Sequence, residues 1–259
     1  MDLGIEGRRA LLTGASKGMG RACAAALARE GVDITIVARG ADRLHQTAEE
    51  IAAETGARVT PVVADITSPD GRAAALKTCP EPDILLNNAG GRKPGDFRDW
   101  EREDWVSALD LMMLAPIQMI RATFDGMKAR GFGRIVNITS RSVKIAQPEL
   151  GLSNGARSGL VGFCAGIARE GVAQNVTVNT LLPGIFGTDA QREHVEGLVV
   201  PGGPTFDEIW AERGARNPAR RYGRPEEIGS YFAFLCSQNA GYITGQALLI
   251  DGGSYPGTF

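Results

Sequence analysis

The sequence predicts an α/β fold in which one parallel sheet is covered by helices on both faces. Short apolar runs alternate along the chain with longer stretches of helical periodicity. Apolar strands that alternate with helices are typical of a parallel sheet buried on both sides. No linker rich in proline, glycine or serine divides the 259 residues. We therefore expect a single domain over residues 1–259, a length that one α/β domain commonly reaches.

The predicted strands and helices follow from this alternation. Between the strands lie roughly six helices, and stretches such as "MGRACAAALAREG" and "ADRLHQTAEEIAAETG" end in glycine, as helix C-termini often do. The segment 185–216 is irregular and follows a late strand, where ligands bind in open α/β sheets, so we expect it to form a mobile substrate lid. About seven strands are expected, at residues 9–14, 33–39, 58–65, 83–90, 133–140, 176–184 and 246–253.

Composition excludes several classes of function. The net charge of −2 gives no reason to expect nucleic acid or an acidic membrane surface as a partner. No window approaches the roughly 20 apolar residues of a membrane span, and the N-terminus does not resemble a signal peptide. Two histidines and four scattered cysteines without a CxxC motif predict neither a metal site nor a disulfide framework. We expect a reduced, cytoplasmic protein that acts on a small molecule.

A glycine-rich turn follows the first predicted strand and begins the first predicted helix. It reads "TGASKGMG" over residues 13–20, with glycines at Gly14, Gly18 and Gly20. Glycine permits a sharp turn and close backbone approach to a pyrophosphate, and the helix N-terminus offers free N–H groups and a positive dipole end. The turn therefore predicts a dinucleotide site.

Four further motifs appear in order: Asp65 after the third strand, "NNAG" at 87–90, Ser140 at the end of the fifth strand, and "PGIFGT" at 183–188. With these motifs nearly the whole chain resembles the short-chain dehydrogenase/reductase family, and within it members of the 3-oxoacyl-ACP reductase type. The resemblance implies a single Rossmann-type, doubly wound sheet. It also implies a homotetramer or homodimer, formed through helices near 100–130 and 154–170 and the C-terminal strand.

The resemblance further implies a set of cofactor contacts. Asp65 would bind the adenine edge, Asn88 to Gly90 would line the ribose, and Pro183 to Thr188 would hold the nicotinamide amide. The cofactor-binding residues implied in this way are Gly14, Ser16, Lys17, Gly18, Met19, Gly20, Arg39, Asp65, Ile66, Asn88, Ala89, Gly90, Arg157, Pro183, Gly184, Phe186 and Thr188.

The choice between NADP and NAD rests on two cations. An acidic residue at the end of the second strand would bind the ribose 2′-hydroxyl of NAD. The sequence places Arg39 there and Lys17 in the glycine turn. Two cations favour a 2′-phosphate through charge-assisted hydrogen bonds. We therefore expect NADP(H), with NAD less favoured.

The catalytic positions depart from the family pattern. The family uses Asn, Ser, Tyr and Lys, with the last two in a YxxxK motif, and only Ser140 is kept here. Ser153 stands in the place of the tyrosine, Arg157 in that of the lysine, and Met112 in that of the asparagine. A serine hydroxyl is a much weaker acid than a phenol, and arginine stays protonated. We take Ser140, Ser153 and Arg157 as the catalytic candidates and expect no ordinary tyrosine-dependent hydride transfer.

Three functions remain open. The first is an NADP(H)-dependent oxidoreductase that acts on a carbonyl or secondary alcohol by a Tyr-independent mechanism. The second is non-redox chemistry such as dehydration, hydration or carbon–carbon lysis, with cations stabilising an enolate. The third is a catalytically inactive nucleotide-binding subunit. The intact cofactor motifs favour the first function.

Four residues are candidates for substrate contact. Arg141 and Lys144 follow Ser140, and together with Arg157 they would form a cationic mouth suited to a carboxylate, a phosphate or an acyl thioester. Asn154 could face the substrate, and His194 in the lid could replace the missing acid.

Overall fold

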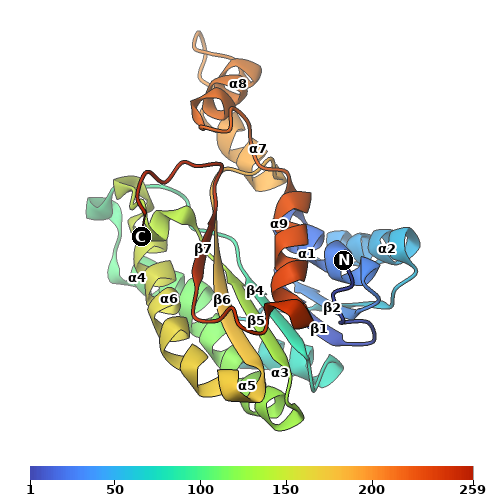
Figure 1. Cartoon of the computed structure of the whole chain (residues 1–259). Helices are drawn as coiled ribbons and strands as arrows, with labels where there is room; N and C mark the ends of the chain where they lie inside the picture. The colour runs from blue at the N-terminus through green and yellow to red at the C-terminus, as the bar shows by residue number, and fades with distance from the viewer. Residues whose placement is uncertain (259) are drawn as a thin grey trace.

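The computed structural model describes residues 1–258, and within them seven strands form one parallel sheet in the order β3-β2-β1-β4-β5-β6-β7 (Figure 1). Every predicted strand is present, and each lies inside its predicted range. The strands are β1 (Arg9–Thr13), β2 (Asp33–Ala38), β3 (Val59–Val63), β4 (Ile84–Asn88), β5 (Gly133–Ile138), β6 (Val176–Pro183) and β7 (Ala247–Ile250).

The described part of the chain contains nine α-helices, more than the roughly six expected. Two of the additional helices, α7 and α8, lie in the segment predicted to be irregular, and a π-helical turn, η2 (Asp110–Leu114), separates α4 from α5. None of the described helices is long and apolar enough to cross a membrane. The helices are α1 (Gly18–Arg29), α2 (Ala41–Thr55), α3 (Pro69–Thr78), α4 (Arg102–Leu109), α5 (Ala115–Arg130), α6 (Gly151–Gly171), α7 (Asp189–Glu196), α8 (Phe206–Arg216) and α9 (Pro225–Cys236).

Each face of the sheet has its own hydrophobic core. Successive side chains of a strand point to opposite faces, so Ala10 and Leu12 of β1 join the core under α1, α2 and α9. Leu11, between them, joins the core under α3, α5 and α6. The continuous apolar runs of the sequence are thus explained by burial on both faces, which confirms the predicted architecture.

The loops that carry the candidate site all leave the same edge of the sheet. In a parallel sheet the carboxyl ends of the strands coincide, and here the strand order reverses between β1 and β4. The segments after β1, β2, β4, β5 and β6 therefore begin side by side. Helices α7 and α8 follow β6 and stand out from the rest of the molecule beyond this edge (Figure 1).

Candidate active site

The glycine turn is packed tightly onto the end of β4. Gly14 has φ +59° and Gly18 has φ +58°, a backbone region that favours glycine. A Cβ at Gly20 would clash with the carbonyl oxygen of Gly14. The same oxygen accepts a hydrogen bond of 2.8 Å from the Asn88 side-chain amide. The turn and the "NNAG" motif thus fix each other, which leaves no room for side chains at Gly14 and Gly20.

The N-terminus of α1 is suited to an anion. Lys17 is the N-cap residue, but no side chain caps the helix and its first turn contains no acidic residue. The first N–H groups of α1 and its positive dipole end are therefore not satisfied by a carboxylate of the helix itself. Ser16 is held by Thr47 of α2, whose hydroxyl donates to the Ser16 carbonyl at 2.7 Å, and Met19 packs against the core. These residues fit the pyrophosphate of a dinucleotide.

Two cations and one carboxylate lie next to this turn. The Ala15 N–H donates to the Val37 carbonyl at 3.4 Å and so joins the segment after β1 to the end of β2. Lys17 lies two residues after Ala15, and Arg39 lies two residues after Val37. Arg39 is 77% exposed, and its Nη1 lies 4.0 Å from Asp65 Oδ2. Hydrogen bonds from the Thr67 backbone and hydroxyl lower the pKa of Asp65, so this carboxylate is ionised at neutral pH. Ile66, the next residue, is buried.

Lys17 makes a contact that the sequence did not indicate. Its ammonium lies 3.0 Å from the carboxylate of Glu193 on α7, and both side chains remain substantially exposed. The start of α7 also touches the glycine turn, because a Cβ at Gly18 would lie 3.4 Å from Thr188, the N-cap of α7. The "PGIFGT" motif thus connects β6 to the cofactor turn. Within it Pro183 ends β6, Gly184 N–H bonds to the Ile250 carbonyl at 3.0 Å, and Phe186 is buried.

Ser153 and Arg157 contact each other. Helix α6 places them one turn apart, and Arg157 Nε donates to Ser153 Oγ at 3.0 Å. Arg157 Nη1 donates to the Ile138 carbonyl at 3.1 Å, and Nη2 donates to the Ala89 carbonyl at 3.2 Å. The guanidinium therefore joins α6 to the ends of β5 and β4. Ser153 is 8% exposed and Arg157 7% exposed, so our expectation that Arg157 lines a cationic mouth is wrong.

Arg157 is a buried cation without a counter-ion. No carboxylate within residues 1–258 lies within 4.0 Å of it, and burial lowers its pKa from 12.5 to about 10. It therefore stays protonated at neutral pH. Three of its five N–H groups have acceptors, which leaves one on each terminal nitrogen. A Cβ at the exposed Gly91 would lie 4.0 Å from Nη2, so this edge of the guanidinium faces the loop after β4.

Ser140 lies two residues after Ile138, whose carbonyl accepts a hydrogen bond from Arg157. It follows β5 and caps the short 3₁₀ helix η3 (Arg141–Val143), accepting a bond of 3.1 Å from Ser142 N–H. Helix η3 packs against α6.

Gly90, at the end of the "NNAG" motif, is exposed, and a Cβ there would meet no atom within 4 Å.

An apolar cluster stands behind Ser153 and Arg157. Met112, at the place of the family's asparagine, is buried in η2 and packs with Ala108 of α4 and with Leu152 and Ala156 of α6. Leu152 and Ala156 directly precede the two polar residues. Met112 and the side chains that it packs with are therefore all apolar.

The remaining substrate candidates are spread over two regions. Arg141 and Lys144 follow Ser140, and neither has a carboxylate within 4.0 Å among the described residues. Lys144 Nζ lies 5.4 Å from the ring centre of Tyr255, in the C-terminal segment that returns toward α6. Asn154 donates to the Gln147 carbonyl at 2.8 Å. His194 lies on α7, where burial and Arg213 of α8 lower its pKa, so its neighbours are on α8 and not on α6.

Comparisons with known proteins show which family this chain resembles. A family model described as enoyl-(acyl carrier protein) reductase matches residues 14–255. The 3-oxoacyl-[acyl-carrier-protein] reductase FabG of Vibrio cholerae is 32% identical and aligns over 98% of this chain and 99% of its own. Gluconate 5-dehydrogenase of Gluconobacter oxydans is 32% identical and aligns over 96% of this chain and 95% of its own. The crystal structure of L-sorbose reductase from Gluconobacter frateurii with NADPH and L-sorbose superposes with a TM-score of 0.95, at 32% identity and full coverage of both chains.

Proposed function

The chain belongs to the short-chain dehydrogenase/reductase family, and from this premise we propose that it is an NADP(H)-dependent oxidoreductase that acts on a carbonyl compound or its alcohol without a tyrosine at position 153. The family membership makes it an enzyme of this class. The cofactor, the substrate and the altered chemistry are our proposal.

The observation that carries the proposal is the preserved cofactor turn with two cations beside it. Gly14, Gly20 and Asn88 hold the turn in shape, and α1 presents free N–H groups to a pyrophosphate. Arg39 is exposed at the end of β2, where a NAD-specific site would have an acid. Lys17 would be the second ligand of a 2′-phosphate. The NADPH in the L-sorbose reductase structure supports the same choice.

The chain's own residues would divide the remaining work. When bound, the cofactor supplies or accepts a hydride. Ser140 and Ser153 each keep a hydroxyl hydrogen that can be donated to a substrate oxygen, and Arg157 supplies positive charge next to Ser153. Arg157 retains its proton at neutral pH, so it can stabilise negative charge but cannot relay protons in the way a lysine does.

An anionic or acyl-thioester substrate fits the surroundings of Ser140. Arg141 and Lys144 remain free of carboxylate partners in the described structure, so both charges are available to a substrate. Such cations raise the local concentration of anions. FabG of Vibrio cholerae, an acyl-carrier-protein reductase by name, supports this class as well. We also propose that α7 and α8 move toward the substrate as a lid.

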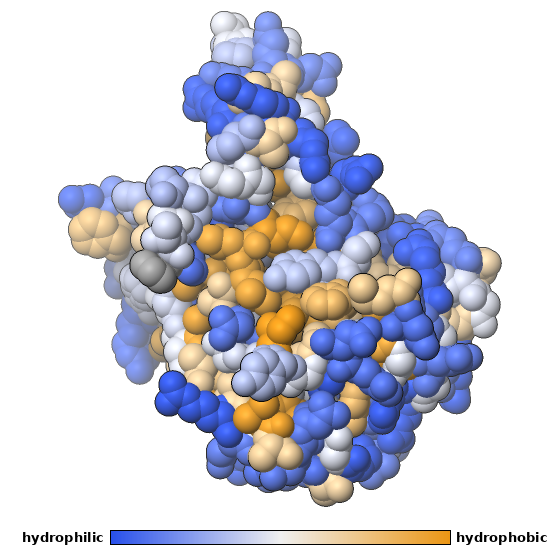
Figure 2. Space-filling model, viewed as in Figure 1, coloured by the Kyte–Doolittle hydropathy of each residue, from blue (hydrophilic) through white to orange (hydrophobic). Residues whose placement is uncertain are grey.

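We further propose a homotetramer or homodimer. Trp105, Val106 and Leu114 of the α4–α5 region expose large apolar side chains. A second apolar area covers part of β7 and α9, where Phe234 and Leu248 are only partly buried (Figure 2). Contiguous apolar surface of this kind usually marks an interface.

Fluorescence titration with NADPH and NADH tests the cofactor proposal. We expect tighter binding of NADPH, and a preference for NADH would contradict the role given to Arg39. NADPH consumption is then followed with a panel of oxo compounds, together with product analysis. Product without consumption of NADPH would replace our proposal by lyase or dehydratase chemistry. If no product forms and no NADPH is consumed, the result would favour a nucleotide-binding subunit without activity.

A further inference from the structure

Each cation of the proposed 2′-phosphate site lies near a carboxylate, but the two carboxylates belong to different parts of the molecule. Arg39 Nη1 lies 4.0 Å from Asp65, whose side chain accepts hydrogen bonds from the backbone and the hydroxyl of Thr67. Asp65 is therefore held in the segment that follows β3. Lys17 Nζ lies 3.0 Å from a carboxylate oxygen of Glu193, which is part of α7. A ligand that competes for Lys17 therefore competes with the proposed lid.

The ion pair of Lys17 and Glu193 is the polar link between α7 and the body of the molecule. Among the hydrogen bonds and ion pairs of residues 1–258, it is the one that joins α7 to a residue outside positions 185–222. The neighbouring contact of Thr188 with Gly18 precedes α7 and involves no charge. The position of α7 beside the glycine turn thus depends on one exposed ion pair.

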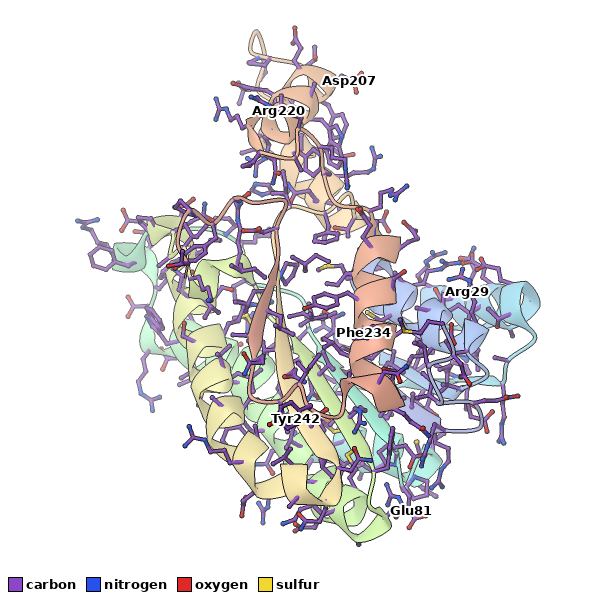
Figure 3. The ribbon with its side chains drawn as sticks, in the orientation of Figure 1. Arg29, Glu81, Asp207, Arg220, Phe234 and Tyr242 are labelled. Carbon is purple, nitrogen blue, oxygen red and sulfur yellow. The ribbon has the colours of Figure 1, made fainter. Side chains whose placement is uncertain are left out.

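Helices α7 and α8 are joined to each other more closely than to the sheet. The guanidinium of Arg192 on α7 lies over the ring of Trp210 on α8, at 4.7 Å from the ring centre, and the two helices pack together. The segment that carries Asp207 and Arg220 stands out from the strands and from the helices that cover them (Figure 3). Loss of the ion pair at Glu193 would therefore free both helices.

A 2′-phosphate is a stronger ligand for Lys17 than Glu193 is. A phosphate monoester carries a charge of about −1.5 to −2 at pH 7 and offers three acceptor oxygens, whereas a carboxylate has a single charge. A phosphate and a carboxylate next to the same ammonium also repel each other. Because Glu193 is largely exposed, its carboxylate can return to water when the phosphate binds.

We propose that Glu193 is a specificity residue of the cofactor site that acts from the proposed lid. It is paired with Lys17 until a 2′-phosphate displaces it, and the displacement releases α7 and α8. A nucleotide without the 2′-phosphate leaves the ion pair in place and α7 beside the glycine turn. This inference rests on the NADP(H) dependence proposed above.

The coupling between the phosphate and α7 works in both directions. A ligand that breaks the ion pair releases α7, and by thermodynamic linkage a chain that lacks the ion pair binds the phosphate more tightly. Exposed ion pairs are weak, so each of these effects is limited to about fivefold. The cofactor with the phosphate is thus the one that frees the proposed lid to move toward the substrate.

NADP⁺ and NAD⁺ differ only in the 2′-phosphate, so calorimetric titration with both tests the role of Glu193. We expect Glu193→Gln to bind NADP⁺ up to about fivefold more tightly than the wild type does, and NAD⁺ equally well. Adding Glu193→Gln to Lys17→Met should change neither affinity. No gain in Glu193→Gln, or a gain for both nucleotides, would overturn the proposal.

Glu196→Gln is the matched control for this charge change. Glu196 is an exposed carboxylate of the same helix and has no cation within 4.0 Å among the described residues. Glu196→Gln should leave both affinities as they are in the wild type. A gain equal to that of Glu193→Gln would show a general effect of net charge and would also overturn the proposal.

Hydrogen exchange measured by mass spectrometry tests the release of α7. At saturating nucleotide, we expect the amides of residues 189–196 in the wild type to exchange up to about fivefold faster with NADP⁺ than with NAD⁺. In Glu193→Gln the two nucleotides should give the same rates. Equal or slower exchange with NADP⁺ in the wild type would overturn the proposal.

The outcomes separate this inference from the function on which it rests. If the wild type does not prefer NADP⁺ to NAD⁺, the cofactor proposal fails, and the role of Glu193 fails with it. If NADP⁺ is preferred but Glu193→Gln behaves like Glu196→Gln, the role of Glu193 fails and the NADP(H)-dependent oxidoreductase remains.

Discussion

Replacing Arg157 by methionine should abolish activity and yet cost little stability. Lowering the pKa of a buried arginine from 12.5 to about 10 corresponds to about 3 kcal/mol against the charged folded state. The three hydrogen bonds of Arg157 involve a charged donor and contribute about 1.5 kcal/mol each at the low end. The two effects nearly cancel, and we expect a loss of about 1 kcal/mol in the free energy of unfolding.

Arg134 provides a matched control at the opposite edge of the sheet. It is fully buried, and burial lowers its pKa to about 10 as well. It makes four hydrogen bonds, to the carbonyls of Gly133, Asn175 and Ser237 and to the Asn175 side chain, and its guanidinium stacks over Phe132 at 4.4 Å. The extra bond and the cation–π contact add about 2 kcal/mol. Arg134→Met should therefore be the more destabilising variant.

Urea unfolding of the wild type, Arg157→Met and Arg134→Met measures the difference. We expect Arg134→Met to lose about 2 kcal/mol more than Arg157→Met, while only Arg157→Met loses NADPH-dependent activity. If Arg157→Met proved at least as destabilising as Arg134→Met, the main role of Arg157 would be to stabilise the fold. Our reasoning that its charge is available to a substrate would then be refuted.

Three further predictions concern the cofactor and the pH. Arg39→Asp should weaken NADPH binding about 10- to 100-fold with little effect on NADH, and an unchanged ratio in fluorescence titrations would contradict the role of Arg39. Glu193→Gln should tighten NADPH binding up to about fivefold, because an exposed ion pair contributes at most about 1 kcal/mol and its loss frees Lys17; weaker binding would argue against that role. Because Arg157 acts in its protonated form, kcat should fall as the pH rises through about 10. A fall near neutral pH would indicate an imidazole instead. In Arg157→Lys the fall should come at a lower pH, since burial without a carboxylate lowers the pKa of lysine.

The sequence was sufficient for the sheet and for the cofactor turn. Each strand lay inside its predicted range because burial on both faces leaves continuous apolar runs. The contact between Ser153 and Arg157 also followed from the sequence, since residues four apart share one face of a helix.

Helix α8 and the burial of Arg157 were not predicted, for different reasons. Helix α8 begins with a capping box of Thr205 and Glu208, a local signal for the start of a helix in the segment expected to be irregular. The contacts that bury Arg157 come from the Ala89 and Ile138 carbonyls, which are 68 and 19 residues away, and Lys17 is separated from Glu193 by 176 residues. Such contacts depend on how loops meet at the sheet edge, and local pattern does not encode them.

The position of deuterium in the product is the most direct test of the chemistry. NADPH carrying deuterium at the transferred position is incubated with the wild type and the oxo compound of the panel that consumes NADPH fastest, and the product is examined by NMR and mass spectrometry. We predict a product with one deuterium bound to carbon. A product without deuterium would contradict the account, because its formation would not involve hydride transfer.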